Sequence, residues 1–178
     1  GASLPFWSPD SDFLGYQMGR RSSGISLWKV SAEGGQSIPI CTMPAGVHVG
    51  KATWGTEGRI VFAASASRMR LSDADLHTVS ENGGEPEIFL QADATERSIN
   101  HPYFLPDGSL LLVVSQGGDS VAVAQMATRY PDPVDASAVG SMMATGVIGQ
   151  DIAVYSPDTG RRILDLPGDF NVEPVYAD

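Results

Sequence analysis

The chain has 178 residues, of which 21 are acidic and 11 are basic, so its formal net charge at pH 7 is −10. A chain of this length is predicted to form one domain that buries about 70% of its unfolded surface. The acidic balance argues against a surface that binds nucleic acid or an anionic membrane. Cys41 is the single cysteine, which excludes an internal disulfide and favours a packed, apolar role for its thiol.

One short motif, an aromatic residue followed by an acidic turn and an apolar stretch, occurs three times at a period of about 50 residues. Such repetition is typical of arrays of small sheets, in which no unit buries its apolar face alone. Trp7 and Trp54 hold the same place in this motif, so we expect both to pack between units rather than to form a sugar-stacking platform. The three copies are Phe6-Trp7-Ser8-Pro9-Asp10-Ser11, Thr53-Trp54-Gly55-Thr56-Glu57-Gly58 and Tyr103-Phe104-Leu105-Pro106-Asp107-Gly108.

A second motif follows the first in phase, because residues 27–35 and 76–84 share Leu, Val, Ser and a Gly-Gly pair at the same places. Its apolar spacing suits a half-buried strand, and Gly-Gly supplies the positive backbone angles that a tight hairpin needs. Further apolar stretches lie between the motifs and after the hairpins. These predicted strands are Phe13–Tyr16, Ile38–Cys41, Ile60–Ala64, Ile88–Leu90 and Leu110–Val114.

Each unit therefore has four antiparallel strands, which is the pattern of a β-propeller blade. No stretch shows a sustained helical period, so the predicted fold class is all-β. We predict one propeller-type domain over residues 1–178. Its blades cover about 4–42, 50–91 and 100–167, the third with an irregular insertion at about 116–150, and 172–178 begin a further blade.

The third unit is irregular in its second half. Its closing hairpin is predicted at Ile152–Tyr155 and Arg162–Leu166, with Ser156–Gly160 as the turn. The insertion carries proline, glycine and methionine residues, and we expect a long surface excursion with a strand at Val121–Gln125. A Met-lined contact surface for a partner is the alternative.

Three blades do not close a ring, because propellers have about four to eight. An open set would leave two sheet faces uncovered, and such faces favour association. We therefore expect either that the chain is part of a larger protein or that a homodimer closes a six-bladed ring. Val175-Tyr176 would then be a surplus innermost strand at the seam, which strand exchange could accommodate.

The two repeated motifs together resemble the TolB-type propeller repeats and the WD-like propellers of large bacterial proteins. The resemblance implies a non-enzymatic module for protein–protein interaction or ligand sensing, without a cofactor, in a larger bacterial protein or assembly. It also favours a periplasmic or extracytoplasmic location, which the residues themselves leave unknown. A propeller-type enzyme, a lyase or glycan hydrolase whose channel site forms only on ring closure, is the alternative. A purely structural set of blades is a third reading.

Sequence motifs for catalysis are absent: the chain has no Gly-x-Ser-x-Gly elbow, phosphate loop or His-Glu-x-x-His. We predict no membrane insertion, no metal site and no catalytic residue. His48 and His101 each precede a predicted innermost strand, and with Arg97 they form the predicted rim, a surface for a protein partner or a small ligand. Asp10 lies in a repeated turn, where we expect it to cap its own backbone.

Overall fold

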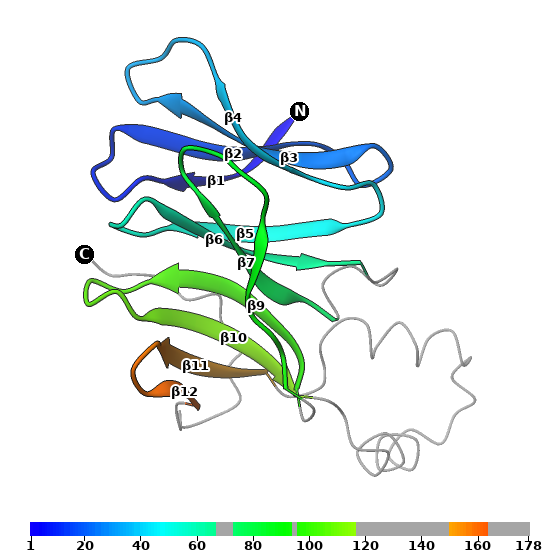
Figure 1. Ribbon diagram of the computed structural model, residues 1–178, viewed down its shortest axis with the longest axis vertical. Helices are drawn as coiled ribbons and strands as arrows, with labels where there is room; N and C mark the ends of the chain where they lie inside the picture. The colour runs from blue at the N-terminus through cyan, green and yellow to red at the C-terminus, as the bar shows by residue number, and fades with distance from the viewer. Residues whose placement is uncertain (67–72, 94–95, 117–149, 164–178) are drawn as a thin grey trace, which may run out of the picture.

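The computed structural model describes residues 1–66, 73–93, 96–116 and 150–163 (Figure 1). All regular structure in these residues is β-strand, which confirms the all-β prediction. Three four-stranded antiparallel sheets follow one another along the chain, and we call them blades 1 to 3. Blade 1 contains β1 (Ala2–Trp7), β2 (Phe13–Arg20), β3 (Gly24–Ser31) and β4 (Ile38–Met43).

Blades 2 and 3 repeat this order of strands. Blade 2 contains β5 (His48–Trp54), β6 (Arg59–Ser65), β7 (Asp75–Ser80) and β8 (Glu87–Leu90). Blade 3 contains β9 (Glu96–Phe104), β10 (Leu110–Gln116), β11 (Gln150–Ser156) and β12 (Gly160–Ile163).

The predicted hairpins are confirmed. Gly34 and Gly35 follow β3 with φ angles of 94° and 113°, and Gly83 and Gly84 follow β7 with 94° and 136°. A side chain with a Cβ atom rarely adopts such angles, which explains why both hairpins use a glycine pair.

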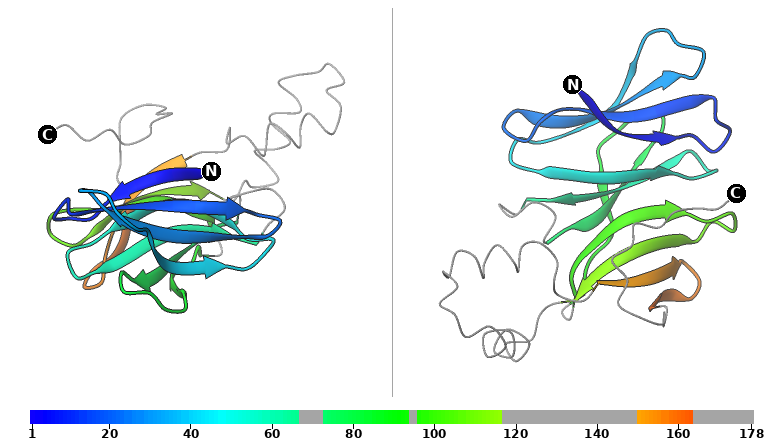
Figure 2. Two further views of the ribbon diagram at one scale, coloured as in Figure 1. Left: turned by 90° about the horizontal axis from the view of Figure 1, so that it is seen from above. Right: turned by 180° about the vertical axis from the view of Figure 1, so that it is seen from behind.

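The blades stack face to face, with blade 2 between blades 1 and 3 (Figures 1 and 2). The first strand of each blade lies against the first strand of the next: β5 contacts both β1 and β9. These three strands therefore form the innermost layer that the repeat predicted.

The core consists of two apolar layers, one on each side of blade 2. Ile60 and Phe62 of β6 are fully buried towards blade 1, whereas Val61 and Ala63 are fully buried towards blade 3. Successive side chains of a strand point to opposite faces, so a strand covered on both faces is apolar at every position. This explains the continuous apolar run of β6.

Trp7 departs from the prediction that both repeated tryptophans pack between blades. Trp54 is 5% exposed, but Trp7 is 57% exposed. The reason is its place in the fold: the equivalent face of blade 2 packs on blade 1, and no described blade precedes blade 1.

Several predictions fall outside the described residues and stay predictions. They concern most of the insertion with the strand Val121–Gln125, the last residues of the closing hairpin, Leu164–Leu166, and the further blade at 172–178.

Candidate functional site

The predicted rim residues lie on innermost strands. His48 is the first residue of β5, where it pairs with Ser65 at the end of β6. Arg97 is in β9, and its Nε atom lies 3.8 Å from Oδ1 of Asp73, which precedes β7. Both residues are therefore at the same end of the blades.

His101 is placed differently from the prediction, because it lies within β9 rather than before it. Phe104 pairs with Leu110 as Trp54 pairs with Ile60, so His101 corresponds to Lys51 of β5 and not to His48. The prediction of His101 before the strand was wrong, because β9 already begins at Glu96. The first residues of this strand carry no repeated motif that would indicate its start.

A bulge accounts for the backbone of His101. The register of β9 against β10 shifts between Tyr103 and Asn100, and His101, which lies between them, has a φ of 51°. Leu4 of β1 has a φ of 48° at the corresponding bulge of blade 1. The left-handed conformation thus recurs at the bulge in blades 1 and 3, and it gives no separate indication of function. The binding role of His48, Arg97 and His101 stays a prediction.

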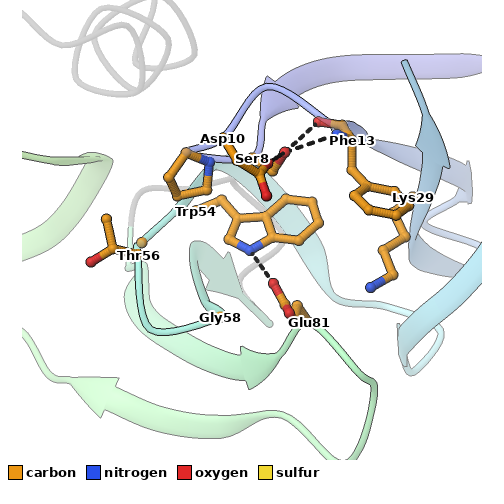
Figure 3. Close-up of a pocket in the computed structure, with 10 residues that line it drawn as sticks. Ser8, Asp10, Phe13, Lys29, Trp54, Thr56, Gly58 and Glu81 are labelled. Carbon is orange, nitrogen blue, oxygen red and sulfur yellow. Dashed lines mark hydrogen bonds between the residues drawn. The ribbon is translucent and has the colours of Figure 1, made fainter. Parts of the chain in front are cut away.

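A cavity of about 420 Å³ lies between blades 1 and 2, at the end where the acidic turns lie (Figure 3). We call it the Lys29 pocket. Its walls come from the turn after β1, from β2 and β3, from the end of β5 and the turn after it, and from the turn after β7. The lining residues that matter below are Asp10, Phe13, Lys29, Trp54 and Glu81.

Trp54 forms the centre of the pocket wall (Figure 3). Its ring packs against Phe6 and Phe13 of blade 1, with centroid distances of 6.1 and 6.4 Å. Its Nε1–H donates a hydrogen bond of 2.8 Å to Oε2 of Glu81. Because the indole is packed by one blade and hydrogen-bonded within the other, it fixes the shape of the pocket.

Lys29 is a charged residue in an apolar position. It lies in β3, paired with Gly15 and Ile38, and is only 8% exposed. Its Nζ atom is 5.1 Å from the ring centre of Phe13 and 5.6 Å from that of Trp54. Both distances are within the range of a cation–π contact.

Lys29 is not among the residues predicted from the sequence, although the repeat contains a signal for it. The register of the strands aligns Lys29 with Thr78 of β7 and Val154 of β11. A lysine therefore stands where the other blades have uncharged β-branched residues. The chain has one other lysine, Lys51.

The acidic turn at the pocket has the predicted role. Oδ1 of Asp10 accepts hydrogen bonds from Ser8 Oγ at 2.6 Å and from the backbone N–H of Asp12 at 3.0 Å. The Ser8 bond, followed by the backbone bond, lowers the pKa of Asp10 below its ordinary value. Asp107 makes the same turn in blade 3 with Ser109.

The remaining reactive groups are part of the packing. Cys41 is buried, and burial raises the pKa of its thiol to about 11. The His77 ring stacks on Phe62 at 5.8 Å, and burial lowers its pKa. The described part of the chain brings no three His, Cys, Asp or Glu residues together as a metal site would require, and contains no helix that could span a membrane.

No protein-family model and no curated protein matches the chain. Solved structures do match it with a TM-score of 0.56, among them an oligogalacturonate lyase in complex with manganese at 15% identity. TolB from Acinetobacter baumannii and a puromycin-hydrolyzing peptidase of Mycobacterium tuberculosis each match with the same score at 13% identity. The fold is that of a β-propeller.

These propeller matches cover 91%, 90% and 95% of this chain, but only 40%, 31% and 22% of the lyase, TolB and the peptidase. The chain thus spans less than half of each. At this identity the likeness concerns the propeller fold alone.

Proposed function

We propose that the chain is a non-enzymatic, TolB-like propeller module for protein–protein interaction or ligand sensing, within a larger bacterial protein or assembly. One observation carries this proposal: blade 1 presents the same apolar face with which blades 2 and 3 bind their neighbours, and in blade 1 this face is open. We call it the Trp7 face.

The strand register defines the equivalent residues. In each blade, one row of three side chains lies across the first three strands and faces the preceding blade. The rows are Trp7, Leu14 and Val30 in blade 1, Trp54, Ile60 and Val79 in blade 2, and Phe104, Leu110 and Tyr155 in blade 3.

Burial separates the first row from the second. Trp54, Ile60 and Val79 are 5%, 0% and 4% exposed because they pack on blade 1. In blade 1, Trp7 is 57% exposed, and Leu14 and Val30 are partly exposed. Met18, further along β2 on the same face, is 39% exposed. Contiguous exposed apolar side chains of this kind are typical of interaction sites.

We propose a second copy of the chain as the occupant of this face. The described residues form three blades, which are too few for a ring, whereas two copies would supply six, which is within the range of known propellers. The face already has the shape and composition that bind another blade of this repeat. The far face of blade 3, on which strand alternation places Leu111 and Val154, would be the complementary surface.

The mass of the particle in solution tests this proposal, measured by light scattering after size-exclusion chromatography. A mass of twice 18.8 kDa is expected. Trp7→Ala should shift the particle towards the monomer. Ile88→Ala is the matched control, because Ile88 is 56% exposed on β8, outside the Trp7 face. A wild-type monomer, or equal effects of both variants, would contradict a second copy at this face.

A further inference from the structure

We propose that the Lys29 pocket binds a small carboxylate ligand that also carries hydroxyl or amine donors, with the Lys29 ammonium as the partner of the carboxylate. This binding site goes beyond the proposed interaction at the Trp7 face. Every residue that lines the pocket comes from blades 1 and 2. The site is therefore complete within one chain and does not depend on ring closure.

The first argument is the charge of Lys29. The residue is more than nine-tenths buried, and within the described residues its ammonium has no hydrogen bond and no ion pair. Its neighbours there are two aromatic rings, and the ammonium opens onto the pocket, so no carboxylate of the described residues neutralises its charge. An anionic group in the pocket would supply the missing partner.

The second argument is the choice of anion. Two carboxylates, Asp10 and Glu81, line the same pocket, so the fixed charges around it sum to a negative value. A phosphate or another multiply charged anion would be repelled by them. A single carboxylate can pair with Lys29 while donors elsewhere on the ligand bind Asp10 or Glu81. Sugar acids and amino acids share this chemistry.

The third argument is the form of the site. A volume of about 420 Å³ is within the usual range of small-molecule sites. Trp54, Phe13 and the two turns hold the walls, and the hydrogen bond from Trp54 to Glu81 orients one of the two acidic groups (Figure 3). Lys29, Asp10 and Glu81 therefore line one cavity whose walls are held in place by the fold.

The chain offers a sharp test, because it contains only two lysines. Protein with ¹³C-labelled lysine gives two sets of side-chain NMR signals. The signals of Lys29 are expected upfield, owing to the ring currents of Phe13 and Trp54. Titration with D-gluconate and with L-serine distinguishes a sugar acid from an amino acid. Sorbitol and L-serinamide are the matched probes that lack the carboxylate.

We expect gluconate or L-serine to shift the Lys29 signals with saturation at about 1 mM or below, while the Lys51 signals stay in place. Lys29→Met should weaken binding by about 10- to 100-fold, the effect of losing one charged hydrogen bond. Lys29→Arg should retain most of it. Lys51→Met is the control and should bind as the wild type does.

Three results would overturn the proposal. First, neither carboxylate could shift the Lys29 signals of the wild-type protein, even at its solubility limit. This result does not depend on whether any variant folds. Sorbitol or L-serinamide could bind as tightly as its carboxylate counterpart. Lys29→Met could bind unchanged. These readouts hold for a monomer as for a dimer, so they are separate from the test of the Trp7 face.

Discussion

Phe104 of blade 3 lies directly on Gly55 of blade 2: a Cβ atom at Gly55 would meet Cε2 of the Phe104 ring at 2.9 Å. Gly55 stands where blades 1 and 3 have Ser8 and Leu105, so the second acidic turn departs from its repeat at the point where the next blade packs. The contact shows how a single residue in one unit is fitted to the aromatic residue of the following unit.

Gly55→Ala should therefore lower the free energy of unfolding, by about 1–3 kcal/mol as is usual when an atom is forced into a packed core. Gly55 has no positive φ, so backbone strain adds nothing. Phe104→Leu should make room for the new methyl group. A double-mutant cycle by chemical denaturation should give a coupling energy above about 0.5 kcal/mol. Additive effects would contradict the contact.

Substitution of Phe62 tests the packing of the apolar layer between blades 1 and 2. It is the largest fully buried side chain, so Phe62→Ala should lower the free energy of unfolding by about 3–5 kcal/mol through lost burial and the cavity that remains. Ile88→Ala, at an exposed site, should stay within about 0.5 kcal/mol of the wild type. Comparable losses in both variants would show that blade 2 does not pack on blade 1 in this way.

The sequence predicts the fold well because its signals are local. Gly-Gly pairs, apolar strands and acidic turns each act over a few residues, and their period locates the blades. The exposure of Trp7 is different. Its motif is the same as that of Trp54, and only the absence of a preceding blade in the described chain decides that one ring is buried and the other is open.

The site is harder to predict than the fold for the same reason. Lys29 lies in a strand whose motif does not distinguish it from its neighbours. Its position beside two aromatic rings depends on Phe13 of blade 1 and Trp54 of blade 2, which come together only in the folded chain. His101 was predicted before its strand because the extension from Glu96 and the bulge depend on pairing with β10, which no motif in β9 records.

Cys41 gives a third prediction. Burial raises the pKa of its thiol to about 11, and its side chain is only 8% exposed, so few molecules hold an accessible thiolate at neutral pH. A thiol reagent such as DTNB should react slowly with the native protein at pH 8 and rapidly in denaturant. With one cysteine in the chain, the reaction should reach one thiol per molecule. Fast reaction of native protein would contradict the burial.

The acidic turns should make the protein sensitive to acid. Hydrogen bonds from Ser8 and Ser109 lower the pKa values of Asp10 and Asp107 below 3.8 in the folded chain. A carboxyl group with a lowered pKa stabilises the fold above its unfolded pKa and loses that effect as the pH falls through the folded value. The melting temperature should thus decline below about pH 4, and Asp107→Asn should flatten this decline while lowering stability at pH 7. Asp158→Asn, in a turn for which no such carboxylate bond is found among the described residues, is the control. A variant Asp107→Asn with an unchanged acid profile would show that this turn does not hold the charged form.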